Sequence, residues 1–330
     1  MPSSPAQRTI APTGITVTTT ETKPEPVSGK PPGQLGDRIF AGSAKGAGIL
    51  ILVVLAGVAA FLVSEAAPAL VAPAEEVHGG LAAYIAPLIF GTVLGAVIAL
   101  LIATPLAVGV ALFISHYAPR RLAQGLSYVV DLLAAVPSIV YGFWGAFTLA
   151  PASVALSVWL NDYLGWIPLF AGPPSVTGRT MLVVSVVLAV MILPIITAVA
   201  REVFLQAPKL HEEAALALGA TRWEMIRLAV LPFGRSGVIS GAMLGLGRAL
   251  GETMAVATIL SVSGAVTLNL ISSENPSTIA ANIALQFPEA SGLDVNVLIA
   301  SGLVLFVITL LVNMLARYIV ERRRDFSGAN

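Results

Sequence analysis

The sequence predicts an all-α polytopic membrane protein with about six transmembrane helices. The 330 residues are 56% hydrophobic and only 11% charged, whereas soluble domains carry about 25% charged residues. The mean hydropathy of the chain is +0.88. Six apolar stretches are each long enough to cross the roughly 30 Å hydrocarbon core of a bilayer. They lie near Gly46–Ser64, Tyr84–Ser115, Ser127–Ala150, Thr180–Ala200, Ser236–Val262 and Val295–Ile319.

The second apolar stretch is longer than a straight span requires, and it contains the dipeptide Thr104-Pro105. Proline lacks a main-chain N–H, so we expect a kink there, tolerated where neighbouring helices satisfy the freed carbonyl. The transmembrane domain as a whole is expected to cover residues 46–320.

The two ends of the chain differ from this domain. Residues 1–45 are rich in Pro, Ser, Thr and Gly and cannot form a packed core, so we expect a disordered tail. The tail is not a secretory signal peptide, because no short basic stretch leads directly into an apolar region. It is either a regulatory segment or a simple solvated extension. Residues 321–330 are expected to form a short C-terminal tail.

Basic residues are distributed unevenly between the connections. They precede the first span, follow the second and the sixth, and recur between the fourth and fifth, whereas the other three connections contain only Arg179. The positive-inside rule therefore places both termini and the segment 201–235 in the cytoplasm. The opposite connections carry mainly acidic side chains.

The composition excludes several classes of function. The net charge is zero, which argues against a nucleic-acid partner. The chain has no cysteine, so it has no disulfides, thiol nucleophile or cysteine metal site. It also lacks a GxxxxGK[ST] phosphate-binding loop, so ATP that drives it would be hydrolysed on another chain. We expect neither a cofactor nor a metal site.

The segment 201–235 predicts a helical elbow outside the bilayer. Pro208 can open a helix, because its missing N–H would be unpaired there anyway. Good helix formers follow, and Gly219 is a natural stop because glycine adopts left-handed angles at little cost. The first elbow helix therefore covers 209–218, with one apolar stripe formed by Leu210, Ala214 and Leu218.

A second short helix is predicted directly after the glycine. Thr221 can cap it, and Glu224 follows three residues later, as in a capping box. The helix is expected to run from Arg222 to Val230 and to end before Pro232. Two short helices around a glycine would form a compact knob; an ordinary interfacial loop is the alternative.

Two ionisable residues lie within the fifth apolar stretch. Arg248 is 13 residues beyond Arg235, or about 20 Å along a helix, and Glu252 lies one turn further on the same face. One interpretation is a structural ion pair. The other is that Arg248 faces a water-filled path and offers a fixed charge to an anion, with Glu252 orienting it. A guanidinium suits phosphate because its planar fork binds two oxygens.

Three glycines recur at four-residue spacing on the same stretch: Gly237, Gly241 and Gly245. Small residues at this spacing let another membrane helix approach closely. We expect them to serve helix packing.

Several motifs resemble those of ABC importer permeases. Glu213-Ala214-Ala215, Gly219 after three further residues, and Leu231-Pro232 are similar to the EAA motif of that family. The family usually has Ile two residues before Leu-Pro, where this chain has Ala229. GRALGETMAV, VPSIVYGFWG and TPLAVGVALFISHYAP are similar to PstC-like permeases of the phosphate-specific transport system. The resemblance covers roughly residues 39–323.

The resemblance implies a type I ABC importer permease in a bacterial inner membrane, with phosphate as substrate. The elbow would be the coupling element that docks on a cytoplasmic ATPase. Its partners would be a second, PstA-like permease, two PstB-like ATPase subunits and an extracytoplasmic PstS-like phosphate-binding protein. The coupling residues would be Glu213, Ala214, Ala215, Gly219, Leu231 and Pro232.

Other functions fit the sequence less well. A sulfate or molybdate importer would use a similar permease. A stand-alone secondary transporter lacks support from an inverted repeat, and it leaves the knob unexplained. The sequence Gly234-Arg235-Ser236-Gly237 fits the GxSG pattern of intramembrane serine proteases, but none of the three histidines lies within the middle of a span to act as a base.

Overall fold

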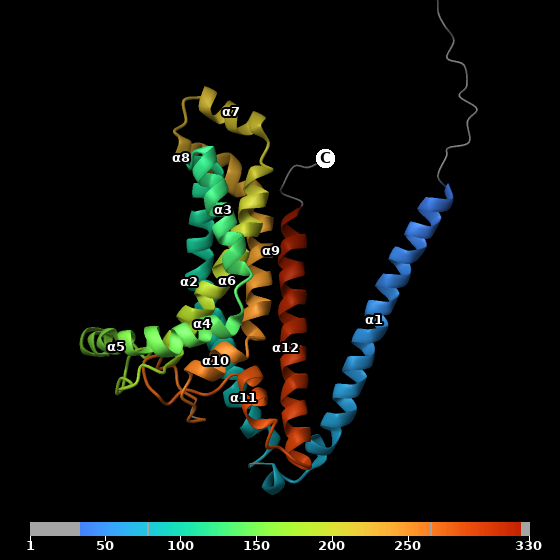
Figure 1. Ribbon diagram of the computed structural model, residues 1–330, viewed down its shortest axis with the longest axis vertical. Helices are drawn as coiled ribbons and strands as arrows, with labels where there is room; N and C mark the ends of the chain where they lie inside the picture. The colour runs from blue at the N-terminus through green and yellow to red at the C-terminus, as the bar shows by residue number, and fades with distance from the viewer. Residues whose placement is uncertain (1–33, 78, 265, 325–330) are drawn as a thin grey trace, which may run out of the picture. The chain divides into compact units, whose positions relative to one another are not determined.

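The computed structural model describes residues 34–77, 79–264 and 266–324. Its regular structure is helical (Figure 1), and within these ranges the one β pairing is an isolated bridge between Val262 and Asn275. In chain order, the helices, with η1 a 3-10 helix and η2 to η4 π-helices, are α1 (Gln34–Val71), η1 (Ala74–Glu76), α2 (Leu81–Leu112), η2 (Phe113–Tyr117), α3 (Arg120–Ala134), α4 (Ser138–Trp144), η3 (Gly145–Leu149), α5 (Ala150–Leu164), α6 (Met181–Leu205), α7 (Lys209–Ala217), α8 (Arg222–Met225), η4 (Ile226–Val230), α9 (Leu231–Leu250), α10 (Met254–Ile259), α11 (Ile279–Gln286) and α12 (Leu293–Arg324).

The chain forms two units, residues 1–55 and 56–330. The described part of the first unit is the beginning of α1, whose large apolar side chains are exposed. This helix begins at Gln34, so residues 34–45, expected in the disordered tail, are helical. Asp37 lies in its first turn, where the positive end of the helix dipole stabilises a carboxylate. Residues 321–324, expected in the C-terminal tail, are the last residues of α12. The other tail residues, 1–33 and 325–330, lie outside the described residues.

Six helical stretches are long and apolar enough to span a membrane, which confirms the predicted number. The helix α2 continues through Pro105 to Leu112. The six stretches are Gly36–Val71, Leu81–Tyr117, Ser138–Leu164, Met181–Leu205, Arg222–Leu250 and Leu293–Tyr318.

The core of the second unit is built around α6, which packs most extensively against α2 and α9 (Figure 1). In its most apolar window 61% of the residues are buried, the largest share among the six stretches. Because alanine is small, the backbones of α2 and α6 approach closely, and such packing stabilises membrane helix pairs. Buried alanines recur along α2 at three- and four-residue spacing: Ala96, Ala99, Ala103, Ala107 and Ala111.

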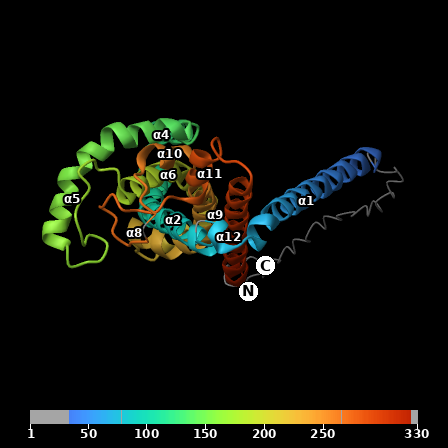
Figure 2. The ribbon, with the colours of Figure 1, turned by 90° about the horizontal axis from the view of Figure 1, so that it is seen from below.

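The third predicted span, Ser127–Ala150, is wrong as a single helix. The helix α3 ends at Ala134, and α4 starts after Pro137. Proline disfavours helical angles in the residue before it and cannot donate to the preceding turn, which explains the break. Figure 1 shows α3 running alongside α6, whereas α4 and α5 turn across the bundle, and Figure 2 shows α5 extending away from it.

The fifth predicted span, Ser236–Val262, is wrong at both ends. The helix begins at Arg222, because α8, η4 and α9 follow one another without interruption, and it ends at Leu250. The second elbow helix therefore does not end before Pro232. The π-helix Ile226–Val230 ends two residues before this proline, and its wider turn accommodates a residue that cannot donate a main-chain hydrogen bond. After Leu250 the chain turns at 251–253 into α10.

Candidate functional site

The predicted knob is formed by α7, by the turn that follows it and by the first turns of the helix from Arg222. The turn is a Schellman motif: Gly219 N–H donates to the Leu216 carbonyl at 2.9 Å and Ala220 N–H to the Ala215 carbonyl at 3.2 Å. Gly219 has φ +87°, the left-handed conformation expected of it, and nothing lies within 4 Å of the position its Cβ would take. Its requirement for glycine is therefore conformational and not steric.

The capping box after the turn is also formed. The Thr221 main-chain N–H donates to Glu224 Oε2 at 2.7 Å, and the Glu224 N–H donates to Thr221 Oγ1 at 3.3 Å. These reciprocal bonds fix the direction in which the long helix leaves the knob. Between α7 and this helix lies an open hollow of about 820 Å³, lined by Ala214, Ala215, Leu218, Gly219, Ala220, Glu224, Arg227 and Leu228.

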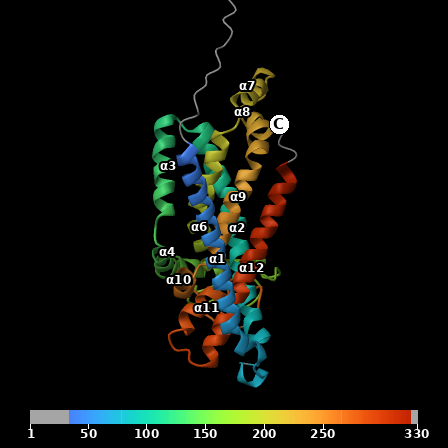
Figure 3. The same ribbon diagram turned by 90° about the vertical axis from the view of Figure 1, so that its right-hand side faces the viewer.

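The apolar stripe predicted on α7 faces outward. Leu210 is 74% exposed and Leu218 is 90% exposed, and Ala214 between them is exposed as well. Glu213 is exposed beside them. In Figure 3, α7 and α8 lie at one end of the bundle and α11 lies at the other. Exposed apolar surface of this kind marks a site of interaction with another protein or with the membrane.

Arg248 lies in the last turn of α9, and its partner comes from α3. Its Nη1 donates to the main-chain carbonyl of Ala134 at 3.4 Å. Tyr141 of α4 donates its hydroxyl to the neighbouring carbonyl of Leu133 at 2.8 Å. Because α3 ends here, the Ala134 carbonyl has no helical partner, whereas the Leu133 carbonyl also accepts from the Val136 N–H at 3.3 Å. A cation at a helix C-terminus also complements the helix dipole. Arg248 and Tyr141 therefore cap a helix that is broken inside the bundle.

Glu252 lies in the turn between α9 and α10, where the residue is 8% exposed. Its Oε1 accepts a hydrogen bond from the main-chain N–H of Ala255, in the first turn of α10, at 3.1 Å. The carboxylate thus satisfies a donor that the short helix leaves free.

The ion pair between Arg248 and Glu252, one of the two interpretations of the sequence, is not formed. One helical turn would have brought them together, but α9 ends at Leu250, between the two. Over the described part of the chain, no guanidinium nitrogen of Arg248 lies within ion-pair distance of a Glu252 oxygen. Each charge is instead held by the end of a broken helix. The guanidinium is half-buried and makes one hydrogen bond to the described residues, which leaves most of its five N–H donors open.

The three glycines of α9 face α6. A Cβ at Gly237 would collide with the Val203 side chain, one at Gly241 would lie 3.2 Å from Val199 Cβ, and one at Gly245 would lie 3.1 Å from Ile196 Cδ1. Gly247, on the same helix, has nothing within 4 Å. The close approach of α9 to α6 therefore depends on glycine at specific positions.

Sequence reasoning did not find Tyr141 or the α3 carbonyls. The available signal was Pro137, since a proline within an apolar stretch indicates a broken helix and free carbonyls at its end. It also did not find the contact between His116 of η2 and Glu212 of α7.

Comparisons with known proteins agree with this architecture. Residues 103–325 match the family described as binding-protein-dependent transport system inner membrane component. The phosphate transport system permease protein PstC 2 of Mycobacterium tuberculosis is 45% identical over 302 residues, covering 87% of this chain and 93% of that protein. PstC of Mycobacterium leprae is 50% identical over 72% of this chain and 76% of its own length.

A solved structure supports the fold. A chain of the MetNI methionine ABC transporter, in an inward-facing conformation, matches with a TM-score of 0.52 at 15% identity, covering 73% of this chain and 96% of that one. With six membrane-length helices, the molecule is an integral membrane protein of the ABC importer permease fold. The chain therefore belongs to the binding-protein-dependent transport system inner membrane components and, among them, to the PstC-like permeases of the phosphate-specific transport system.

Proposed function

We propose that this chain is the PstC-like permease subunit of an ATP-driven phosphate importer and that phosphate passes Arg248. The observation that supports the proposal most strongly is the position and hydrogen bonding of this guanidinium. It lies where α3 and α9 both end inside the bundle, and it is bound to one carbonyl with its other donors open. The PstC relatives support phosphate as the anion.

The electrostatics favour transient anion binding. The carboxylate of Glu252 is engaged by the Ala255 N–H, so it leaves the charge of Arg248 without a close counter-ion. A fixed charge inside the low-dielectric bundle acts more strongly on a passing anion than the same charge would in bulk water. The planar fork of arginine matches two phosphate oxygens. From beyond ion-pair distance, the charge of Glu252 would still lower the local positive potential, so that the anion can leave.

The knob would couple transport to ATP hydrolysis. We infer that Glu213, Ala214, Ala215 and Gly219 form the surface that docks on one of two PstB-like ATPase subunits. The exposure of Leu210 and Leu218 supports this, because apolar side chains at the tip of a bundle favour a protein partner. The run Leu231-Pro232 lies within the long helix that connects the knob to Arg248. ATP-driven closure of the ATPases would then move this helix and switch the pathway from inward- to outward-facing.

The remaining partners and the orientation follow from the same proposal. A second, PstA-like permease would complete the pathway, and a PstS-like protein would deliver phosphate from outside. Both termini and the knob would lie in the cytoplasm of a bacterial cell, with the protein in the inner membrane. The basic residues of segment 201–235 support this orientation.

A sulfate or molybdate importer is the competing function, because these oxyanions present a guanidinium with similar oxygens. The test is reconstitution of the chain with the second permease, the ATPase and the binding protein in proteoliposomes. We expect ATP-dependent uptake of phosphate that excess sulfate and molybdate do not reduce. Uptake that sulfate or molybdate abolishes would assign the permease to that oxyanion. Phosphate uptake by proteoliposomes made from a preparation with which no ATPase co-elutes would indicate a secondary transporter.

A further inference from the structure

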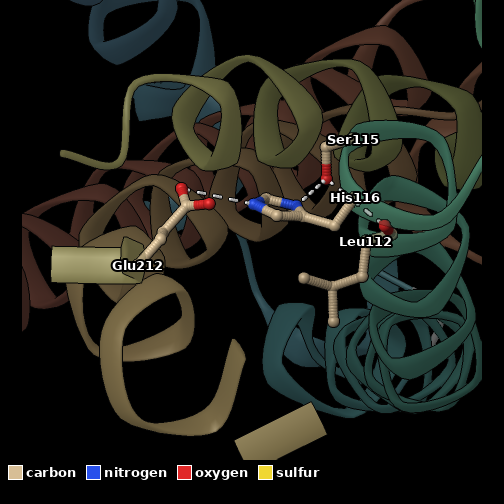
Figure 4. A network of polar contacts seen from close by, with 4 residues as sticks. All are labelled: Leu112, Ser115, His116 and Glu212. Atoms are coloured by element: carbon tan, nitrogen blue, oxygen red, sulfur yellow. Dashed lines mark hydrogen bonds and ion pairs between the residues drawn. The ribbon is translucent and has the colours of Figure 1, made fainter. Parts of the chain in front are cut away.

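One polar contact joins the knob directly to the end of α2. Glu212, in the first turn of α7, lies with its Oε1 3.6 Å from Nε2 of His116 in η2 (Figure 4). Over the described residues, no other Lys, Arg or His nitrogen lies within ion-pair distance of a carboxylate. The contact is partly shielded from water, because the His116 side chain is 10% exposed and that of Glu212 is 22% exposed.

The imidazole ring is held in place on its far side. Ser115 Oγ lies 2.7 Å from His116 Nδ1, and the same hydroxyl lies 3.4 Å from the carbonyl of Leu112, one turn earlier. A charged ring donates from Nδ1 to Ser115, and the hydroxyl then donates to Leu112. A neutral ring with its hydrogen on Nε2 accepts from Ser115 instead. In both arrangements Nε2 carries a hydrogen, and Figure 4 shows that this nitrogen lies on the side of the ring that faces Glu212.

The contact between Glu212 and His116 orients α7, whose apolar packing alone does little to set its orientation. The helix α7 packs mainly on α8 and η4, the elements that follow it in the chain. Its Ala215 also lies against the apolar cluster in which Met225 and Ile226 of the long helix meet Ala111 and Leu112 of α2. Apolar surfaces of this kind resist separation more than they resist sliding or rotation, because the hydrophobic effect is non-directional. The polar contact between Glu212 and His116, at 3.6 Å, is made from one side of α7 and therefore limits the rotation of this helix about its axis.

We propose that His116 is a positioning residue for energy coupling: it holds α7 at a fixed orientation on α2, so that a displacement of α7 is carried into α2. This inference rests on the proposed docking of α7 on an ATPase. The receiving helix is well placed, since α2 packs along the central helix α6 through its alanine stripe. Without the contact, the knob would still bind the ATPase. A displacement of the knob would then partly rotate α7 about its own axis, and less of it would reach α2.

The experiment uses the complete complex with the second permease, the ATPase and the binding protein in proteoliposomes. It measures the amount of ATPase that co-elutes and the ATP hydrolysis rate with and without phosphate-loaded binding protein. For His116→Ala we expect normal co-elution and a stimulation of hydrolysis lowered about fivefold, within the usual range for coupling between sites. His116→Arg, which can still donate to Glu212, should recover most of the stimulation. Tyr117→Phe, on the same turn, is the matched control and should behave as the unmutated chain does.

Two results would overturn the inference. One is that, in the His116→Ala complex, phosphate-loaded binding protein stimulates ATP hydrolysis as much as in the unmutated complex. The other is a fall in co-elution that matches the fall in stimulation, with His116→Arg no better than His116→Ala, which would make the contact purely structural. The unmutated complex provides the separate test of the proposed function: if it binds no ATPase or imports no phosphate, the function fails and the inference fails with it. If it couples normally and the variants have no effect, only the inference fails.

Discussion

The guanidinium of Arg248, at the end of α9, donates to the main-chain carbonyl of Ala134, at the end of α3. A cation inside the membrane bundle is thus anchored by backbone and not by a carboxylate. Its charge is therefore available to an anion, whereas an arginine in a closed ion pair would be neutralised. Glu252 has a different partner, the Ala255 N–H, and the first prediction concerns that cap.

Glu252→Ala should be more destabilising than Glu252→Gln. Glutamine keeps an oxygen that can accept from the Ala255 N–H, whereas alanine leaves this donor unpaired, at a cost of about 1 kcal/mol. The measurement is the thermal unfolding midpoint of the purified complex in detergent. If Glu252 acted mainly as a counter-ion for Arg248, both variants would remove the charge and lower the midpoint equally.

Gly219→Val should weaken docking of the ATPase, and Gly219→Asn should not. The φ of +87° strains a β-branched residue by roughly 1–3 kcal/mol, whereas asparagine tolerates left-handed angles. Because no atom lies within 4 Å of the position that a Cβ would take, side-chain size alone does not separate the two variants. The measurement is ATPase co-purification at equal membrane levels of the chain. Equal co-purification of both variants would show that the turn does not set the docking surface.

Gly237→Ala should destabilise the protein, and Gly247→Ala on the same helix should not. The added methyl at Gly237 collides with Val203 of α6, and overpacking of this kind costs about 1–3 kcal/mol. At Gly247 the methyl meets open space. Comparison of the two unfolding midpoints checks this prediction. A similar midpoint for the two would mean that α9 can move away from α6 at little cost.

The orientation predicts which single cysteines an impermeant maleimide reaches, and the chain has no cysteine of its own. Val176, in the connection between α5 and α6, is 88% exposed, and Val176→Cys should react when the reagent is added outside spheroplasts. Ala217→Cys, on the exposed surface of α7, should react only in inside-out vesicles. The reverse pattern would place the knob outside the cell, where it could not bind a cytoplasmic ATPase.

The sequence predicted the class of fold and the local chemistry of the knob well. Six apolar stretches and the turn residues Gly219, Thr221 and Glu224 act through local interactions, so their signals are readable along the chain. The bounds of the third and fifth spans were wrong, because apolar periodicity does not mark where a helix breaks inside a membrane. For the third span, Pro137 marks the position of the break. For the fifth span, Pro232 suggested a helix end, but a π-helix before it allows the helix to continue.

The candidate site was predicted only as a set of residues. Arg248 and Glu252 were found because charged residues in an apolar stretch are costly and mark function. Their partners were not found, since Ala134 lies 114 residues before Arg248 and contributes only its backbone. Contacts of this kind depend on how helices pack, and neither composition nor spacing reports them. The same holds for His116 and Glu212, which lie on separate helices.

The central claim is that Arg248 provides the charge that draws phosphate through the permease. The most direct test is phosphate uptake by the double variant Arg248→Gln with Glu252→Gln, normalised to the amount of assembled complex in the membrane. The double variant leaves neither charge unpaired and keeps an acceptor for the Ala255 N–H, so we expect it to assemble normally. We predict that its uptake falls to the level of liposomes without complex. Near-normal uptake per assembled complex would contradict the account and make Arg248 a structural cap of α3.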